Sequence, residues 1–354
     1  MPIKIVIVDD SALMRKLLVG VLGGDPELVV VGTAGDPFAA RDLIKSTSPD
    51  VLTLDVEMPR MDGITFLRNL MKLRPMPVVM ISSLTERGAD TTLTALELGA
   101  VDFVAKPRLD LAHGVADLGD EIIAKVKMAA KARITQRTPR TLAPPPTGPV
   151  PSLKTTERVI AIGASPSLKT TERIIAIGAS TGGTEAIARI LEALPPDGHG
   201  VVMAQHIAAE FSRRFAERLD ACSPLVVREA SDGDPILRGH AYLAPSHHHL
   251  RVVRSGARYL CALSAEPPHN RHRPSVDVLF ESVARSAGAN AIGVLLTGMG
   301  ADGADGLAAM RAQGALTIAQ DRETSVVWGM PGEAVKREAA SEVLPLDKIA
   351  ARLR

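Results

Sequence analysis

Short, continuously apolar runs alternate with amphipathic stretches along the first 125 residues. The runs are typical of buried parallel strands, because such strands are covered on both faces. The stretches between them have helical apolar spacing, and several end at glycine. We therefore predict strands at residues 3–8, 28–31, 51–54, 78–81 and 101–105, helices at 13–22, 37–45, 63–74 and 89–98, and a charged helix at 118–133 that leads outward. This order predicts an α/β fold with a doubly wound, flavodoxin-like (βα)5 sheet.

A second alternating region begins near residue 173, after a change of composition. The segment between the two regions is rich in proline and predicts an extended, semi-rigid linker; its prolines are Pro139, Pro144, Pro145, Pro146, Pro149 and Pro151. Beyond it we predict strands at residues 174–177, 200–204, 291–296 and, as the last strand, 316–319, helices at 184–194, 211–219 and 307–313, and an antiparallel hairpin within 226–263. The C-terminal region is therefore also expected to be a doubly wound, mostly parallel α/β domain.

An unusual feature precedes that domain. Residues 151–165 and 166–180 are a tandem repeat in which only Val159 and Ile174 differ. The copies are too similar for a structural repeat, and a solenoid would need three or more units. We interpret the tandem as a recent duplication or an artificial insertion, of which only one copy can occupy a strand position in one domain.

Length and composition narrow the class of protein. A chain of 354 residues is long enough for about two domains. The net charge of +1 argues against a dedicated polyanion binder, and an aromatic content of 3% makes base stacking on single-stranded nucleic acid unlikely to matter. Only two cysteines are present, Cys222 and Cys261, which suits a reducing cytoplasm. Neither a membrane-spanning apolar run nor a signal peptide is expected.

Polar residues at the strand ends of the first region predict one site. Asp9, Asp10 and Asp55 follow the first and third strands, and Ser82 and Lys106 end the fourth and fifth. The carboxyl ends of parallel strands meet in one crevice, and three carboxylates there suit Mg²⁺. A hydroxyl and an ammonium in the same crevice could bind a phosphoryl group on Asp55. Taken singly, the two first aspartates could be helix caps and Lys106 a solvated lysine.

These residues carry a resemblance to a known family. Residues 1 to about 125 resemble the response-regulator receiver domain, in the pieces VDDS, LDVEMPRMDG, ISS and AKP. The resemblance implies that Asp55 accepts phosphate from a histidine kinase, with Mg²⁺ on Asp9, Asp10 and Asp55, and that Ser82 and Lys106 sense the phosphoryl oxygens. Phe103 stands where the family has its switch aromatic, although a plain core phenylalanine explains it equally well.

A second candidate site lies in the C-terminal region. Residues 178–182 fit G-x-S-x-G between a strand and a helix, a turn that exposes a serine, here Ser180, beside helix-terminal N–H groups. A phosphate-cradling loop or a plain turn would fit the same glycines. His206 follows the next strand and could serve as a base, although a structural histidine is the better reading of it alone. Asp302, in a glycine-rich loop after a later strand, could orient that base.

Three consecutive histidines, His247, His248 and His249, offer an alternative to that reading. Side chains of three neighbouring loop residues cannot all face one ion, so we expect a solvated loop rather than a metal site. The dinucleotide fingerprint G-x-G-x-x-G is missing after the strand at 174–177, which disfavours an NAD enzyme.

The C-terminal motifs resemble a second family. Residues 173–354 resemble the catalytic domain of the CheB protein-glutamate methylesterases, in the pieces IGASTGG, AQHI, FAERL, RPSVDVLF, LTGMGADGA and DRETSVVWGMP. The resemblance implies a Ser180, His206 and Asp302 triad, Thr181 beside the nucleophile, and the Met299 N–H as an oxyanion donor. It implies hydrolysis of glutamate γ-methyl esters on chemoreceptors, glutamine deamidation as a side activity, and no metal for hydrolysis.

Together the two resemblances imply a complete regulatory enzyme. The expected domains are a receiver at 1–125, a linker with the first tandem copy at 126–172, and a methylesterase domain at 173–354. The receiver is expected to inhibit the catalytic domain until the chemotaxis histidine kinase CheA phosphorylates Asp55. The expected location is the cytoplasm, with recruitment to chemoreceptor arrays, and neither nucleic-acid binding nor membrane insertion is expected.

Three departures from the family pattern bear on these expectations. Ala208 and Ser246 stand where relatives commonly have proline and glycine, but neither belongs to the triad. Ser165, in the first tandem copy, is followed by Pro166, which lacks the N–H that Thr181 supplies after Ser180. Ser180 is therefore the expected nucleophile. A phosphorylation-controlled binding module without catalysis, and a transcription factor, remain as alternatives, and the second lacks a helix-turn-helix signature.

Overall fold

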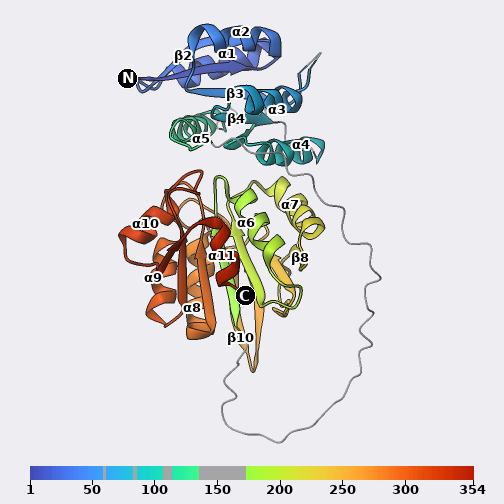
Figure 1. The fold of residues 1–354 in the computed structure, drawn as a ribbon, viewed down its shortest axis with the longest axis vertical. Coiled ribbons are helices and arrows are strands. Elements are labelled where there is room, and N and C mark those ends of the chain that lie inside the picture. The colour runs from blue at the N-terminus through green and yellow to red at the C-terminus, as the bar shows by residue number, and fades with distance from the viewer. Residues whose placement is uncertain (59–60, 83–85, 107–113, 135–172) are drawn as a thin grey trace, which may run out of the picture.

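Two α/β units make up the described part of the chain (Figure 1). The structure, a computed structural model, describes residues 1–58, 61–82, 86–106, 114–134 and 173–354. The predicted proline-rich linker and the first tandem copy, with Ser165, lie outside the described residues.

The N-terminal unit contains one sheet of five parallel strands in the order β2-β1-β3-β4-β5. The strands are β1 (Ile3–Val8), β2 (Leu28–Ala34), β3 (Val51–Asp55), β4 (Val78–Ser82) and β5 (Asp102–Ala105). The helices are α1 (Ala12–Gly23), α2 (Pro37–Thr47), α3 (Gly63–Leu73), α4 (Glu86–Glu97) and α5 (Gly114–Ala129). The predicted (βα)5 fold of the flavodoxin type is confirmed.

Alternating side chains of β1 explain how this sheet is covered on both faces. Ile5 and Ile7 pack in one buried cluster with α1 and α5, whereas Val6 and Val8 pack in another with α2, α3 and α4. The helix predicted at 118–133 is present as α5, but the expectation that it leads outward is wrong. Ile122 and Val126, one turn apart, are fully buried in the cluster with α1, so α5 covers the sheet instead.

The C-terminal unit contains a sheet of seven parallel strands in the order β14-β13-β12-β6-β7-β9-β8, and a separate antiparallel hairpin β10-β11. The strands are β6 (Ile174–Ala179), β7 (Gly200–Gln205), β8 (Val226–Glu229), β9 (His240–Leu243), β10 (His249–Ser255), β11 (Arg258–Ser264), β12 (Ala291–Leu295), β13 (Leu316–Gln320) and β14 (Glu342–Leu344). The helices are α6 (Gly183–Ala193), α7 (Ala209–Cys222), α8 (Val276–Ala287), α9 (Ala304–Ala312), α10 (Met330–Lys336) and α11 (Leu346–Arg352), with a 3₁₀ turn at Gly288–Asn290.

Two helical layers enclose this sheet. Helices α6, α7 and α11 share a buried cluster with one face, and α8, α9 and α10 share a cluster with the other. The chain runs from β6 outward to β7 on one side, and β12 pairs with β6 on the other side. The strand order therefore reverses beside β6, and such a switch point opens a crevice at the carboxyl ends of the strands.

The sequence pattern predicted the hairpin and the doubly wound fold but missed several elements. Helix α8, helices α10 and α11, and strands β8 and β9 were not predicted, and β14 follows the strand that was expected to be last. Helix α8 was missed because almost every residue of its first half is buried, which removes the amphipathic signal. Among the described residues, no helix is both long and apolar enough to cross a lipid bilayer.

The tandem repeat gives the first testable prediction. The second copy supplies β6, so removing residues 151–165 should leave folding intact and change the free energy of unfolding by less than about 1 kcal/mol. Chemical denaturation of the deleted and full chains measures this change.

A matched deletion provides the control for that experiment. Removing residues 166–180 instead leaves the same sequence except that Val159 takes the place of the buried Ile174. We expect this second deletion to be less stable than the first by about 1 kcal/mol, the usual cost of an isoleucine-to-valine change. Loss of folding in both deletions would mean that the extra residues are part of the fold.

Candidate functional site

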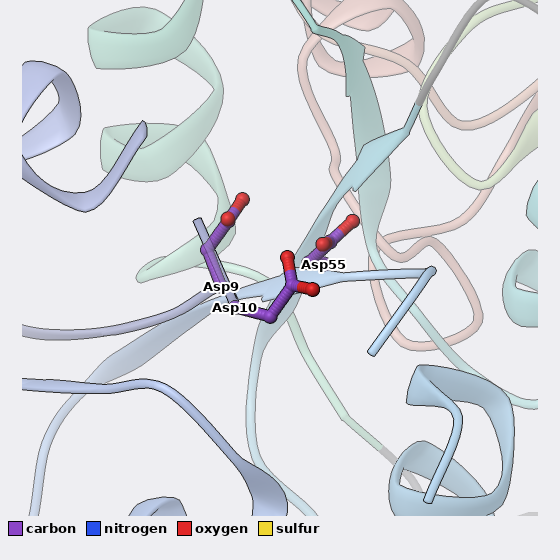
Figure 2. A group of neighbouring side chains, drawn as sticks. All are labelled: Asp9, Asp10 and Asp55. Atoms are coloured by element: carbon purple, nitrogen blue, oxygen red, sulfur yellow. The ribbon is translucent and has the colours of Figure 1, made fainter. Parts of the chain in front are cut away.

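Three carboxyl groups gather at the strand ends of the N-terminal unit (Figure 2). Asp9 and Asp10 follow β1, and Asp55 is the last residue of β3, which pairs directly with β1. One carboxylate oxygen from each residue lies within 4.8 Å of the others. The parallel register of β1 and β3 therefore brings the three predicted ligands together.

Lys106 compensates part of this negative charge. Its ammonium lies 2.8 Å from Asp55 Oδ2 and 3.3 Å from Asp9 Oδ2. Burial raises the pKa of Asp55 to about 6, although the hydrogen bond and charge of Lys106 limit the rise. Burial also raises the pKa of Asp9. A single lysine therefore does not fully stabilise the ionised cluster, and further positive charge would be favourable there.

The donor set of this cluster fits a hard divalent cation. Asp9 Oδ2 and Asp55 Oδ2 are buried, and in the part of the chain that the structure describes both are paired with the Lys106 ammonium. Asp10 is exposed beside them. Carboxylate oxygens with room for water on the exposed side are the ligands that Mg²⁺ prefers.

Ser82 and Phe103 occupy the neighbouring strands β4 and β5. The Ser82 hydroxyl is buried at the end of β4 and accepts a hydrogen bond of 2.7 Å from Thr92 of α4. The Phe103 ring is 7% exposed and lies 4.5 Å, centroid to centroid, from Phe211 of α7 in the C-terminal unit. Phe103 is therefore buried against the other unit rather than within its own core alone.

Ser180 lies on a tight turn between β6 and α6. The turn depends on Gly182, whose φ of 75° is in the left-handed region and whose added Cβ would lie 2.7 Å from Val326. The Ser180 N–H donates to Thr297 O at 3.0 Å, and the Gln205 side chain donates to Ser180 O at 2.9 Å. These bonds tie the turn to the neighbouring strands on both sides.

The glycine-rich loop after β12 packs directly against this serine. A Cβ added to Gly298 would lie 2.7 Å from Ser180 Cβ, so only glycine allows the backbone to approach so closely. The next residue, Met299, is 40% exposed. The backbone of this loop and the Ser180 turn therefore come into direct contact at the serine.

His206 and Asp302 form the hydrogen-bonded pair that the sequence predicted. Nε2 of the His206 ring lies 2.8 Å from Asp302 Oδ2, and the backbone N–H of His206 donates to Ala179 O at 3.1 Å. A carboxylate can only accept, so Nε2 carries the proton. Nδ1 is buried without a hydrogen-bond partner in the described structure, which leaves its lone pair for an incoming proton. No hydrogen bond yet joins Nδ1 to Ser180, as is common without substrate.

Asp302 is held at the N-terminus of α8. The carboxylate accepts from the Val276 N–H at 2.7 Å, the Ser275 hydroxyl at 2.8 Å and the Asn270 amide at 3.0 Å. Burial alone would raise the pKa of Asp302, but the His206 partner and these donors outweigh it and lower that pKa. The acid is therefore ionised and fixed in orientation.

The other histidines of the region differ in role. His272 stacks on His206 with ring centroids 3.7 Å apart, and burial lowers the pKa of His272 to about 4. The expectation of a solvated loop at residues 247–249 is wrong for His249, which is fully buried. Its Nδ1 accepts from the Ser275 N–H at 3.2 Å and its Nε2 lies 3.1 Å from Pro267 O. His249 therefore supports the start of α8.

The N-terminal unit covers the turn that carries Ser180. Thr181 is buried, and its hydroxyl donates to the carboxylate of Asp102 in β5. Arg218 of α7 binds the α4 residues Thr94, through a 3.2 Å hydrogen bond, and Glu97, through an ion pair. In Figure 1, α4 and α5 lie on the side of the N-terminal unit that faces α6 and α7. The two candidate sites are thus linked through one interface.

Several residues of the site carried no sequence signal that we used. Asp102 contacts the C-terminal unit and Arg218 contacts the N-terminal unit. Both contacts arise only because the surfaces of the two units pack together. Asn270 and Asp277 lie beside Asp302 in space but 32 and 25 positions from it along the chain. Two hints were available: the polar run of residues 269–275, which contains Pro274, and the piece RPSVDVLF, which contains Asp277.

The chain was compared with known proteins. It matches the CheB methylesterase family over residues 175–353 and the response regulator receiver domain over residues 5–114. It is 56% identical to the protein-glutamate methylesterase/protein-glutamine glutaminase 1 of Xanthomonas campestris over 99% of this chain and 96% of that protein. It is also 56% identical to the corresponding enzyme 2 of Pseudomonas aeruginosa, over 100% of this chain and 96% of that protein.

A solved structure agrees with the fold of the C-terminal unit. The CheB methylesterase catalytic domain of Thermotoga maritima is 36% identical, with a TM-score of 0.50, and the match covers 51% of this chain and 97% of that one. The full-length matches and both domain matches lead to one conclusion: the chain belongs to the CheB methylesterase family and carries a response regulator receiver domain.

Proposed function

We propose that this protein is a phosphorylation-controlled carboxylic ester hydrolase that acts on methylated chemoreceptors. It hydrolyses glutamate γ-methyl esters to glutamate and methanol and deamidates glutamine side chains as a second activity. The observation that carries the proposal is the hydrogen-bonded His206–Asp302 pair beside a serine on a tight strand-to-helix turn. The names of the full-length relatives support the substrate class.

The three triad residues have distinct roles in the reaction. Ser180 Oγ attacks the ester carbonyl, and Nδ1 of His206 takes its proton because Nε2 is occupied by Asp302. Asp302 stabilises the resulting imidazolium. The imidazolium then protonates the leaving methoxide, and His206 next activates a water that releases the acyl group from Ser180. Each of these steps uses only side chains and water.

Backbone donors supply the remaining stabilisation. The N–H groups of Thr181 and Met299 belong to the two backbone segments that flank Ser180, and the close approach at Gly298 brings these segments together. Donors fixed in this way stabilise the negative oxygen of the tetrahedral intermediate without having to reorganise.

The receiver domain controls access to this site. Asp55 accepts a phosphoryl group from a histidine kinase, proposed to be the chemotaxis kinase CheA. Asp9, Asp10 and Asp55 would hold Mg²⁺, which supplies positive charge to the phosphoryl oxygens when bound. Lys106, already 2.8 Å from Asp55, and Ser82 contact the phosphoryl group. Phe103 transmits the change, because its ring is in the interface.

Inhibition follows from the position of that interface. The Asp102–Thr181 hydrogen bond places β5 of the receiver next to the nucleophile. A receptor helix could not reach Ser180 while this contact persists, so phosphorylation has to weaken it. The proposed division is a receiver at 1–125, a linker at 126–172 and a methylesterase domain at 173–354. We propose that the enzyme works in the cytoplasm, at chemoreceptor arrays.

The nucleophile assignment is tested by methanol release from methylated chemoreceptor membranes with acetyl phosphate as phosphodonor. We expect Ser180→Ala to lose release, because the hydroxyl that forms the acyl-enzyme is gone. Ser165→Ala is the matched control and should release methanol at the rate of the unaltered chain. Release that survives Ser180→Ala would favour the binding-module alternative or a different nucleophile.

The role of Asp302 is tested by Asp302→Asn. The amide cannot stabilise the imidazolium, and kcat for methanol release should fall by a factor on the order of 10³–10⁴. Near-ultraviolet circular dichroism shows whether the fold is retained. A near-normal kcat in a folded Asp302→Asn chain would contradict the triad.

Control by the receiver is tested at its phosphorylation site. Asp55→Ala should remove the stimulation of methanol release by acetyl phosphate, and chelation of divalent cations by EDTA should have the same effect on the unaltered chain. The measurement is the ratio of initial rates with and without acetyl phosphate. Full stimulation of Asp55→Ala would rule out this mode of control.

The same assay tests the inhibitory interface. Arg218→Ala removes the bonds to Thr94 and Glu97, and we expect the rate without phosphodonor to rise by about fivefold, which corresponds to about 1 kcal/mol. Arg213→Ala is the control, because Arg213 is exposed on the same helix and pairs with Glu217 of that helix. An equal effect of both substitutions would exclude a specific contact.

A further inference from the structure

A second carboxyl group, that of Asp277, lies buried beside the acid of the triad. Asp277 is in the first turn of α8 and is 2% exposed. Its Oδ1 accepts from the Gly306 N–H at 2.7 Å, and its Oδ2 accepts from the Asn270 amide at 2.8 Å. No step of the reaction described above uses this group. Burying a carboxyl group costs free energy, so its position calls for an explanation.

Asn270 connects the two carboxyl groups. Its Nδ2 donates to Asp277 Oδ2 at 2.8 Å and to Asp302 Oδ1 at 3.0 Å. The donor is therefore shared between the acid of the triad and the second carboxyl. Asp302 Oδ2 in turn binds Nε2 of His206, so a continuous path of polar contacts runs from Asp277 to the imidazole.

The backbone around Asn270 is arranged for this contact. Asn270 and Arg271 have φ values of 53° and 68°, which is the left-handed region, and reciprocal hydrogen bonds of 3.0 and 2.8 Å between His269 and His272 close the turn. Asparagine tolerates this region, but arginine does so at a cost of about 1 kcal/mol. The turn delivers the Asn270 amide to both carboxyls and the His272 ring to His206.

The charge on Asp277 changes within the working pH range. Burial raises the pKa of Asp277 to about 6, and the neighbouring negative charges of Asp302 and Asp305 contribute to the rise. The Gly306 N–H opposes the rise. Asp277 therefore gives up its proton at a higher pH than an exposed aspartate does.

We propose that Asp277 is a positioning residue that acts through Asn270 and Asp302 to increase the basicity of His206. The inference rests on the proposed function in so far as His206 is the general base. A negative charge behind Asp302 stabilises the imidazolium in addition to Asp302 itself. The shared Asn270 amide keeps the two like charges apart and holds Asp302 Oδ2 toward the ring.

Other charged groups face this pair from the surrounding elements. Asp305 of α9 and Arg337, which follows α10, form an ion pair with each other near Asp277. His249 lies behind Ser275 at the start of α8, and His272 stacks on His206. On the receiver side, the charge of Lys125 opposes protonation of His272. The side chain of Asp305 is 70% exposed, so solvent screens its effect on His206 far more than that of the buried Asp277.

The test is a titration of His206 in the full chain labelled with ¹⁵N-histidine, without phosphodonor. The ring nitrogens of His206 are identified as the signals that His206→Gln removes. We expect Asp277→Asn and Asp277→Ser each to lower the titration midpoint of the ring by about half a pH unit or more. The two replacements differ in size and hydrogen bonding but share the lost charge, so a common shift reports the charge.

Asp305→Asn is the matched control. It also removes one negative charge near Asp277, but from an exposed position without contact to Asp302, and should leave the midpoint in place. The acid limb of the pH profile of kcat/KM should move to lower pH in both Asp277 variants, with a plateau rate reduced about threefold. A structural role alone would lower the rate without moving the limb.

Three results would overturn the inference. They are an unmoved midpoint in folded Asp277 variants, an equal shift in Asp305→Asn, and, should the variants not fold, the absence in the unaltered chain of an inflection of the His206 signals near pH 6, where Asp277 ionises. Failure of the proposed function is distinguishable from all three. It would appear as no methanol release by the unaltered chain, whereas the midpoint shift does not require substrate.

Discussion

The arrangement of the candidate site in the C-terminal unit depends on the hydrogen bonds that the Asp302 carboxylate accepts. It is buried, yet it remains ionised because the first N–H groups of α8, the Ser275 hydroxyl and His206 all donate to it. One charge thereby fixes the loop after β12, the start of α8 and the ring at the end of β7 relative to each other. Ser180 needs no such anchor, because its turn is held by neighbouring strands.

The two units stabilise their buried carboxylates in different ways. Around Asp302, neutral donors and a histidine stabilise the negative charge. Around Asp55, one lysine is present and burial raises the pKa, so the site gains stability from an added cation. The first arrangement suits a rigid catalytic group, and the second suits a group whose charge is meant to change.

The interface between the units links these two arrangements. Asp102 and Phe103 are adjacent on β5, and they contact Thr181, which follows Ser180, and Phe211. Lys125 of α5 pairs with Asp102 at 3.3 Å and lies 5.1 Å from the Phe103 ring. A rearrangement of β5 would therefore disturb polar and apolar contacts of the interface at once.

By itself, the sequence determined both α/β sheets and placed the predicted site residues at strand ends, because buried parallel strands are continuous apolar runs and their carboxyl ends share one edge. It also favoured Ser180 over Ser165 as the nucleophile, since only Ser180 is followed by a residue with an N–H and by glycines, but which tandem copy forms β6 came from the structure. Helix α8, the partners Asn270 and Asp277, and the Asp102–Thr181 contact were decided only by the tertiary structure. The physical reason is that these contacts join segments far apart in the chain, and neither periodicity nor local turn chemistry encodes how two packed surfaces meet.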